Sequence, residues 1–412
     1  MLGYGISNQS LSEYFKKNKI DYLLYDDYLE EFHQDIDLNR FDIMVKSPVI
    51  TPDHYLVQLA KRLNKPIITD LELFYSLQQT KTFITVTGTN GKTTTVKLIK
   101  HLLNDLDLGG NVGIPLFNFI DSPRDIIIEA SSFMLEYTID FHSKYNLILN
   151  ITPNHLDHHQ TFGEYTRCKL KLLKNITAAD YLIYNYDDLL LRRLVSNYQA
   201  KLIPFSLVSK VNGGYLLGDY LYYQNQKIIN VNNIQLLGKH NLANILASIC
   251  VVLNYRKDLS SLESRVKTFQ AVEHRIEYLG EFDEIKVYND SKSTNYRALK
   301  IALDAFLNEE ILLVCGGKTR IDNINLLNNS LTKLKQVLVN GENQGELIKY
   351  FKSKNIPVMG YCNLENLLDN IIAYLKPGLT ILFSPGSSSY DQFKNFEQRG
   401  LYFKKRILQI LG

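Results

Sequence analysis

The sequence of 412 residues has no tryptophan and few cysteines and methionines. We attribute the absence of tryptophan, beside 27 tyrosines, to compositional bias and draw no functional conclusion from it. The four cysteines are scattered, without the close pairing that metal-binding cysteines show: Cys168, Cys250, Cys315 and Cys362. Reduced thiols are therefore the expected state.

Long apolar runs and a large net charge are also missing. No apolar run approaches the ~18 residues of a membrane span, and the N-terminus lacks a signal-peptide core. We therefore expect a cytoplasmic protein without membrane insertion. The net charge of +3, from 46 basic and 43 acidic residues, gives no argument for nucleic acid as a partner. The chain is too long for one ordinary core, so two or three domains are expected.

One stretch combines a short strand, a glycine-bounded loop and a helical pattern. The β-branched run 83–86 is typical of a buried parallel strand, and apolar residues from Val96 to Leu103 mark one face of a helix. The loop between them ends in Gly91-Lys92-Thr93. Its first gap is shorter than in the usual G-x-x-x-x-G-K-[ST] pattern. A glycine turn that merely precedes a helix is the alternative, but strand, loop and helix together favour a phosphate loop.

This arrangement is suited to binding nucleotide phosphates. Backbone N–H groups of a glycine-rich loop surround phosphate oxygens, and the helix N-terminus adds a positive dipole end. Lys92 would reach the β- and γ-phosphates, and the Thr93 hydroxyl would hold Mg²⁺. The residues expected to bind ATP here are Gly88, Thr89, Asn90, Gly91, Lys92, Thr93 and Thr94.

Two further strand ends carry polar side chains. The apolar run 125–128 ends at Glu129, where ligands bind in parallel sheets, so Glu129 is a candidate Mg²⁺ ligand; helix capping is the alternative. The strand predicted at 147–151 leads to His155, which we expect in the site. We expect His158 and His159 in a solvated loop. On a later helix Asn241 and Asn244 share one face, where two amides could contact adenine.

The N-terminal residues 1–78 indicate a small α/β unit with a strand at 22–25. Gly3-Tyr4-Gly5 followed by Asp26 is a weak dinucleotide-type pattern, because the third glycine position holds Asn8 and almost no strand precedes Gly3. NAD binding is therefore not favoured. Asp26 would still suit a ribose or uracil contact, and Ser47 follows another short strand at a turn that could face phosphate.

The C-terminal residues 272–412 indicate a further α/β unit. A dense polar cluster from Asn289 to Asn295 follows a strand, which favours a binding site over a plain turn. Gly316-Gly317-Lys318-Thr319 is not a second phosphate loop, because no helix follows at the right spacing. The segment 384–389, rich in serine, is predicted to form an anion site at a strand-to-helix turn.

These segments together resemble the Mur ligase family over nearly the whole chain. The resemblance is carried by the loop at 88–94, the motif 129–136, Asn150 to Asp157, the pairs 240–241 and 274–275, and the cluster 289–295. The tract Ser384 to Gly400 resembles the members that add D-glutamate. Other members of the family, a folyl polyglutamate ligase, a phosphotransferase and a regulatory ATP-binding protein remain the rival interpretations.

The resemblance implies an enzyme that uses ATP to phosphorylate the carboxylate of UDP-N-acetylmuramoyl-L-alanine, after which D-glutamate attacks the acyl phosphate. It implies two Mg²⁺ ions, held by Thr93, Glu129, His155 and Lys169, and carbamylation of Lys169 by CO₂. Lys92, His155 and Lys169 would be catalytic. We expect a monomer.

The resemblance also assigns the remaining contacts. Those to ATP would be Asn241, Asn244, Arg275 and Asp290. Those to the uridine-nucleotide substrate would be Ser7, Asn8, Asp26, Ser47, Asn111 and Ser131. Those to D-glutamate would be Lys292, Thr294, Arg320, Ser389 and Phe396, with Lys318 as a competitor of Arg320.

The expected fold is α/β with three domains. Residues 1–78 would form a Rossmann-like domain for the uridine nucleotide, and 79–271 a central parallel sheet with the phosphate loop. Residues 272–412 would form a second Rossmann-like domain for the amino acid.

Overall fold

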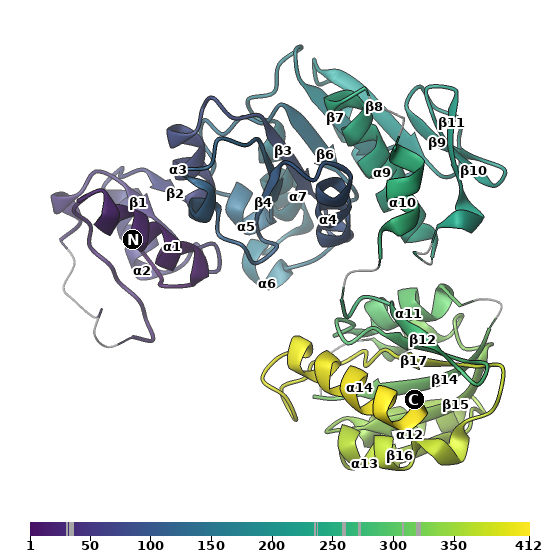
Figure 1. Cartoon of the computed structure of the whole chain (residues 1–412). Coiled ribbons are helices and arrows are strands. Elements are labelled where there is room, and N and C mark those ends of the chain that lie inside the picture. Colours follow the sequence, from purple (N-terminus) through teal and green to yellow (C-terminus); the bar gives the residue numbers. More distant parts are fainter. Residues whose placement is uncertain are drawn as a thin grey trace. The chain divides into compact units, whose positions relative to one another are not determined.

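The computed structural model describes residues 1–29, 32, 37–234, 236, 238–257, 261–270, 273–306, 309–318 and 323–412. The chain forms two compact units, which are described separately (Figure 1). Unit 1 comprises Met1–Ile234 and His240–Phe269, and unit 2 comprises Gln235–Lys239 and Gln270–Gly412.

The N-terminal part of unit 1 has a small parallel sheet, β1 (Met44–Val45) with β2 (Ile67–Ile68). Leu2 adds single bridges to Lys46 and Tyr25, which replace a full first strand. The strand predicted at 22–25 is therefore wrong except for the bridge at Tyr25. The helices here are α1 (Ile6–Lys17), α2 (Tyr55–Arg62) and α3 (Asp70–Leu77).

The large sheet of unit 1 has nine strands in the order β11-β10-β9-β8-β7-β6-β3-β5-β4. Neighbours are parallel from β4 to β9, and β10 and β11 continue as antiparallel hairpins. The strands are β3 (Phe83–Thr87), β4 (Asp107–Gly110), β5 (Ile126–Glu129), β6 (Tyr145–Ile148), β7 (Tyr181–Asn185), β8 (Lys201–Ser206), β9 (Gly214–Leu217), β10 (Tyr220–Tyr223) and β11 (Gln226–Asn230).

Helices cover this sheet because its central strands are apolar on both faces. All five residues of β3 are buried, as expected of a strand between two helical layers. Phe83 and Ile126 share one apolar core with Leu11 and Phe15 of α1, so the N-terminal part packs on the large sheet. The helices are α4 (Lys92–Leu102), α5 (Ser132–Leu135), α6 (Leu156–His159), α7 (Phe162–Leu170), α8 (Leu189–Val195), α9 (Lys239–Tyr255) and α10 (Leu262–Thr268).

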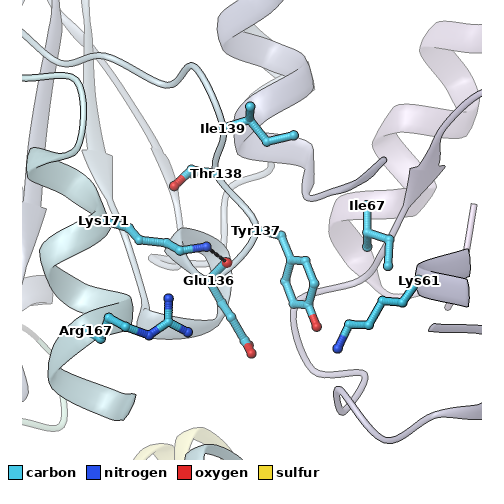
Figure 2. A pocket seen from close by; sticks show the side chains of 8 residues that line it. All are labelled: Lys61, Ile67, Glu136, Tyr137, Thr138, Ile139, Arg167 and Lys171. Carbon is cyan, nitrogen blue, oxygen red and sulfur yellow. Dashed lines mark hydrogen bonds between the residues drawn. The ribbon is translucent and has the colours of Figure 1, made fainter. Parts of the chain in front are cut away.

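A pocket of about 250 Å³ lies between the N-terminal part of unit 1 and the segment around α5 and α7. Figure 2 shows Lys61 and Ile67 on one side of it and Arg167 and Lys171 on the other, with Glu136 between them. Lys171 donates a hydrogen bond to the main-chain carbonyl of Glu136. The pocket thus exposes one carboxylate among three basic side chains.

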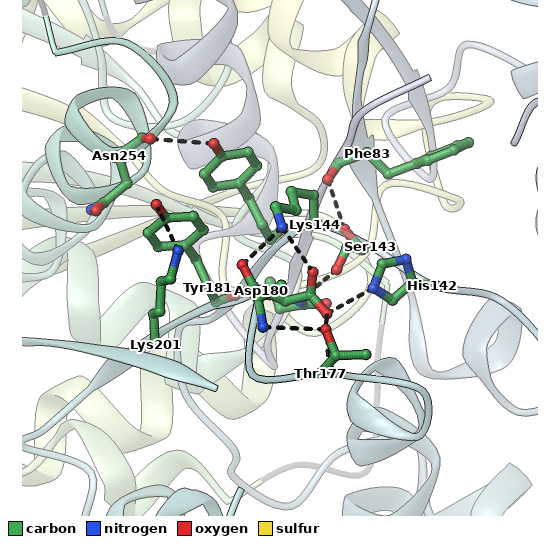
Figure 3. Close-up of polar contacts among 12 residues, drawn as sticks. Phe83, His142, Ser143, Lys144, Thr177, Asp180, Tyr181, Lys201 and Asn254 are labelled. Atoms are coloured by element: carbon green, nitrogen blue, oxygen red, sulfur yellow. Dashed lines mark hydrogen bonds and ion pairs between the residues drawn. The ribbon is translucent and has the colours of Figure 1, made fainter. Parts of the chain in front are cut away.

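A cluster of polar residues connects the segments that lead into β6 and β7 through hydrogen bonds and ion pairs (Figure 3). Asp180 is almost completely buried, and its Oδ2 lies 2.7 Å from His142 Nε2 and accepts hydrogen bonds of 2.7 Å from the Thr177 N–H and hydroxyl. Lys144 lies 3.3 Å from the other oxygen. Burial alone would raise the pKa of Asp180, but these partners outweigh it and hold the pKa below its usual value.

Unit 2 is a six-stranded sheet in the order β12-β13-β17-β14-β15-β16, parallel except for the β12–β13 hairpin. Its strands are β12 (Glu277–Phe282), β13 (Ile285–Asn289), β14 (Glu310–Gly316), β15 (Leu334–Asn340), β16 (Val358–Tyr361) and β17 (Leu379–Phe383). Its helices are α11 (Tyr296–Asp304), α12 (Gln344–Ser353), α13 (Leu364–Asp369) and α14 (Phe396–Leu411).

The fold class predicted from the sequence is confirmed: both units are α/β with sheets that are mostly parallel. The division into domains at 78 and 271 stays a prediction. Across the described ranges, no helix has both the length and the apolar character that a membrane crossing requires.

Candidate active site

The predicted strand, loop and helix are present at residues 83–102. β3 ends at Thr87 and α4 begins at Lys92, so residues 88–91 form the turn between them. Gly91 has φ +88°, which disfavours a side chain, and a Cβ there would lie 2.4 Å from Oδ1 of Asn244. The close approach of α9 to the loop therefore requires glycine at this position.

Groups from the segment after β6 and from α7 hold the loop in place. The Thr89 hydroxyl donates to the Thr152 carbonyl (3.0 Å) and accepts from the Tyr165 hydroxyl (3.0 Å). The Asn150 side chain bonds both main-chain groups of Asn90, at 2.9 and 3.1 Å. Our sequence analysis gave no role to Asn150 or Tyr165, because their contacts depend on tertiary packing. They preorganise the loop that the sequence did reveal.

Two lysines meet at one carbonyl of this loop. Nζ of Lys92 donates to the carbonyls of Gly88 (2.8 Å) and Thr89 (3.0 Å), and Nζ of Lys169 donates to the same Gly88 carbonyl (2.8 Å). Lys169 is only 1% exposed. Burial, together with the charge of Lys92, lowers the pKa of Lys169 well below its ordinary value, while Glu129 acts in the opposite direction. Deprotonating Lys169 to its neutral amine therefore costs less free energy than it does for an ordinary lysine.

Glu129 is the last residue of β5 and pairs in register with Val86 of β3, beside the loop. The residue is 1% exposed. Oε1 accepts a hydrogen bond from Asn111 Nδ2 at 2.9 Å, whereas Oε2 is buried without a hydrogen-bond partner among the described residues. A buried carboxylate oxygen without a partner is costly. Glu129 is therefore suited to receive a cation, and its role as a Mg²⁺ ligand stays a prediction. Ser131 follows it as the N-cap of α5, and its hydroxyl accepts from the Met134 N–H.

The histidine motif is arranged differently from our expectation. His155 is exposed and has φ +53° at the start of α6. The expectation that His158 and His159 are solvated is wrong, since both are buried. The single turn of α6 directs both rings toward Phe133, and Nε2 of His159 lies 2.9 Å from the Ser132 hydroxyl.

The two amides on α9 lie at the phosphate loop. Asn241 and Asn244 are both buried, and Nδ2 of Asn244 donates to Oδ1 of Asn241 at 3.3 Å. Their spacing on one helix face is confirmed, and the contact of Asn244 with Gly91 brings them together with the loop. Thr93 and Thr94 are the second and third residues of α4, which follows the loop.

The four N-terminal residues predicted to hold a uridine nucleotide gather around Gly3. Asn8 is fully buried and donates to the carbonyls of Leu2 and Gly3, at 3.2 and 2.7 Å. Asp26 Oδ2 accepts from the Tyr4 N–H at 2.6 Å, and Ser47 N–H donates to the Leu2 carbonyl at 2.7 Å. Ser7 bonds the buried carboxyl of Asp70. In this structure Asn8 and Asp26 shape the turn with their side chains.

In unit 2 most of the other predicted residues lie at the carboxyl ends of β13 and β17. Asp290 is buried, accepts from the Ser384 hydroxyl at 2.7 Å, and has its pKa raised by burial to about 7, with the charges of Arg275 and Arg399 acting against that rise. Lys292 Nζ lies 5.1 Å from the ring centre of Phe396. Arg275 and Thr294 flank this cluster in sequence, and Ser389 is buried. Arg320 lies outside the described residues, as does Thr319.

Arg399 organises the cluster in unit 2, and the sequence analysis gave it no role. It is 3% exposed and donates to the Ser291 hydroxyl (3.1 Å) and to the carbonyls of Ser291 (2.8 Å) and Ser387 (2.9 Å). Burial lowers its pKa to about 10. It thereby joins the end of β13 to the loop after β17.

The prediction that the serine tract lies at a helix N-terminus is wrong. α14 begins only at Phe396 and is capped by Asn395, so residues 384–389 belong to the loop between β17 and α14. There the Ser387 hydroxyl accepts from Asn343 Nδ2 at 2.8 Å. The polar sequence was sufficient to predict a loop, but the position of the helix start depends on the later cap.

Several solved structures and one protein-family model are similar to this chain. The UDP-N-acetylmuramate–alanine ligase MurC of Thermotoga maritima matches with TM-score 0.64 at 17% identity, over 99% of this chain and 98% of that one. A MurF ligase of Thermotoga maritima in complex with ADP matches with TM-score 0.63 at 17% identity, over 89% and 95%. Residues 86–252 match the Mur ligase middle domain. The fold is therefore that of the Mur ligases.

Proteins of similar sequence show to which group of Mur ligases this chain belongs. The UDP-N-acetylmuramoylalanine–D-glutamate ligase of Lactococcus lactis subsp. lactis is 36% identical over 400 residues, 94% of this chain and 89% of that protein. The enzyme of the same name from Streptococcus sanguinis is 34% identical over 380 residues, 90% and 84% of the two chains. This chain belongs to the family of the UDP-N-acetylmuramoylalanine–D-glutamate ligases.

Proposed function

We propose that this protein is an ATP-dependent ligase that adds D-glutamate to UDP-N-acetylmuramoyl-L-alanine, releasing ADP and phosphate, in peptidoglycan precursor synthesis. Its family supports the substrates. The observation that carries the proposal for the chemistry is the meeting of Lys92, Lys169 and the unpartnered Oε2 of Glu129 at one phosphate loop.

The reaction needs activation of a carboxylate. An amine cannot displace oxide from a carboxylate, so the γ-phosphoryl group of ATP is first transferred to it. The amine of D-glutamate then attacks the acyl carbon, and inorganic phosphate leaves. Catalysis of this kind consists mainly of positioning and of neutralising charge. Lys92 and the main-chain N–H groups from Gly88 to Thr94 would hold the triphosphate at the positive end of α4.

The residues around Glu129 fit two Mg²⁺ ions. The buried, unpartnered Oε2 is the observation that favours a cation, because carboxylate and hydroxyl oxygens are the ligands Mg²⁺ prefers. Thr93 and Glu129 would hold one ion, and Glu129 with His155 the second. When bound, these ions supply charge neutralisation for the phosphates and the developing acyl phosphate.

Carbamylation of Lys169 forms part of the same proposal. The ammonium of Lys169 first loses one proton. The neutral amine then attacks CO₂: the nitrogen–carbon bond forms while one C–O π bond opens to a carboxylate oxygen, and the nitrogen loses a second proton, so that a cation has become an anion. The lowered pKa of Lys169 makes the neutral amine available, and the change of sign removes the repulsion from Lys92. A carbamate at Lys169 would contribute oxygen ligands on the side of Glu129.

We further propose that the predicted substrate contacts act as assigned. Ser7, Asp26 and Ser47 would border the uridine nucleotide, with Asn8 supporting their turn, and Asn111 and Ser131 would lie toward its peptide end. Asn241, Asn244, Arg275 and Asp290 would contact ATP. Lys292, Thr294, Ser389 and Phe396 would receive D-glutamate together with Arg320. The monomeric state and the cytoplasmic location stay predictions from the sequence.

The test is phosphate release by the purified protein with Mg²⁺-ATP, UDP-N-acetylmuramoyl-L-alanine and a panel of amino acids. We expect release that requires D-glutamate and fails with L-glutamate, L-lysine and D-alanine. Lys92→Ala should abolish it, whereas Lys97→Ala, an exposed lysine of the same helix, should not. Use of a different amino acid would refute the assignment of D-glutamate. Binding of ATP without release for any acceptor would favour a regulatory ATP-binding protein.

A further inference from the structure

A second group of potential metal ligands lies beside the active site and has no part in the proposed reaction. Glu136, His159 and Cys168 each offer one ligand atom, and these atoms lie within 4.8 Å of one another. They come from three short elements of unit 1: the end of α5, the end of α6, and α7. His159 and Cys168 are buried.

We propose that Glu136, His159 and Cys168 form a site for one thiophilic divalent cation of the Zn²⁺ class. A carboxylate oxygen, an imidazole nitrogen and a thiolate are a donor set that Zn²⁺ accepts in four-coordinate geometry. Mg²⁺ favours oxygen ligands and does not favour sulfur, so the thiolate of Cys168 separates this site chemically from the one proposed at Glu129, which contains no sulfur. Three protein ligands leave a fourth position for water.

The geometry is close to what such an ion requires. Bonds of roughly 2.0–2.3 Å in a tetrahedron separate the ligand atoms by roughly 3.3–3.8 Å, so the three side chains would have to approach by about 1 Å. Nε2 of His159 lies 2.9 Å from the Ser132 hydroxyl, so ligation through Nε2 would replace that contact, whereas ligation through Nδ1 would keep it. Burial lowers the pKa of His159 to about 4, so its ring is neutral and able to ligate.

The surroundings contain the supporting contacts that metal sites use. His158 Nε2 lies 2.9 Å from Oε2 of Glu136 and fixes that carboxylate, as outer partners of metal ligands do. The ligand form of Cys168 is the thiolate, so binding of the ion would release the thiol proton into solution as the metal–sulfur bond forms.

An ion can reach the site from the pocket shown in Figure 2. Glu136 lines that pocket together with Tyr137 and Arg167, and its side chain is 14% exposed. The ion would tie α6, a helix of one turn, to α7, which carries Tyr165 and Lys169. Its role would therefore be to stabilise the position of elements that flank the phosphate loop.

Cobalt substitution tests the proposal on the whole, metal-free protein without any substrate. One equivalent of Co²⁺ should produce thiolate-to-cobalt absorption in the near ultraviolet and the intense visible bands of four-coordinate cobalt, and one equivalent of Zn²⁺ should remove both. The ligands proposed for Mg²⁺ are oxygen atoms and a histidine nitrogen. They contain no sulfur and cannot give the thiolate-to-cobalt absorption. The readout is therefore independent of the proposed ligase activity.

Substitutions of the proposed ligands test which side chains bind the ion. Cys168→Ser and His159→Gln should lose the thiolate band, and Cys250→Ser and Cys362→Ser, a buried and an exposed cysteine elsewhere, should keep it. His158→Gln should weaken Co²⁺ binding by about 10–100-fold.

Alkylation of cysteines in the wild-type protein tests the site without a variant that could fail to fold. Zn²⁺ should protect Cys168 of the wild-type protein from alkylation under partial denaturation, as read by mass spectrometry, and leave Cys250 unprotected. Absence of a thiolate band with stoichiometric Co²⁺, its persistence in Cys168→Ser, or equal protection of both cysteines would each overturn the site.

Discussion

Replacing Gly91 by alanine tests whether the close approach of α9 fixes the phosphate loop. The backbone at Gly91 has φ +88°, and an alanine there costs about 1–2 kcal/mol in conformation alone. The new methyl group would lie 2.4 Å from Oδ1 of Asn244, so that side chain must move and its hydrogen bond to Asn241 is lost, for about 0.5–1.5 kcal/mol more. The expected total for Gly91→Ala is about 1.5–3.5 kcal/mol.

Gly378→Ala is the matched control. Gly378 has φ +83° and no heavy atom within 4 Å of an added Cβ, so only the conformational cost of about 1–2 kcal/mol applies. Urea denaturation followed by circular dichroism gives both losses in the free energy of unfolding, and calorimetry gives the affinity for ATP. Gly91→Ala should also bind ATP at least about tenfold more weakly, which corresponds to 1.4 kcal/mol, while Gly378→Ala should bind it normally.

The double variant Gly91→Ala/Asn244→Ala provides the decisive comparison. If the contact with Asn244 causes the extra loss, the two changes together should cost less than the sum of the single changes. Equal losses of stability in Gly91→Ala and Gly378→Ala, or strict additivity in the double variant, would refute the reasoning.

Three further changes have defined outcomes. Asp180→Ala should reduce the free energy of unfolding by about 2–3 kcal/mol, because it leaves buried donors unsatisfied. The pKa of Asp180 is lowered in the folded protein, so the extra stability of the wild type should be complete above pH ~4 and should be lost as the pH falls through the folded pKa. Urea denaturation at several pH values measures this difference. Asp290 has a raised pKa of about 7, so folding is penalised as the pH rises from ~4 to 7, and Asp290→Asn should gain stability over wild type across that interval; a constant difference would contradict this. Arg399→Lys should cost about 2–3 kcal/mol because an ammonium cannot reproduce its three hydrogen bonds, whereas Arg406→Lys, at a partly exposed pair with Asp369, should cost under about 1 kcal/mol by thermal unfolding.

The sequence predicted those elements whose pattern is local. The strands that became β3 and β5 are short apolar runs, and each lies within one residue of its expected position. The phosphate loop was also predictable, because glycine, lysine and threonine at fixed spacing have few other uses. The position of Glu129 at the end of β5 was predictable from the apolar run before it, while its role as a ligand at that strand end stays a prediction.

The features that the sequence did not reveal depend on contacts between distant segments. The burial of His158 and His159 is set by Phe133, more than 20 residues away in the chain, and no local pattern shows it. Arg399 resembles any helical arginine until the loops at Ser291 and Ser387 fold around it.

The shared carbonyl of Gly88 has a consequence for selectivity among anions. Before carbamylation, protonating Lys169 would place two ammonium groups at one acceptor, and their mutual repulsion is one cause of the lowered pKa of Lys169. An anion with one negative charge can offset only one of these charges, whereas a polyphosphate can offset both. The uncarbamylated protein therefore favours highly charged ligands electrostatically, and carbamylation of Lys169 would reduce that preference.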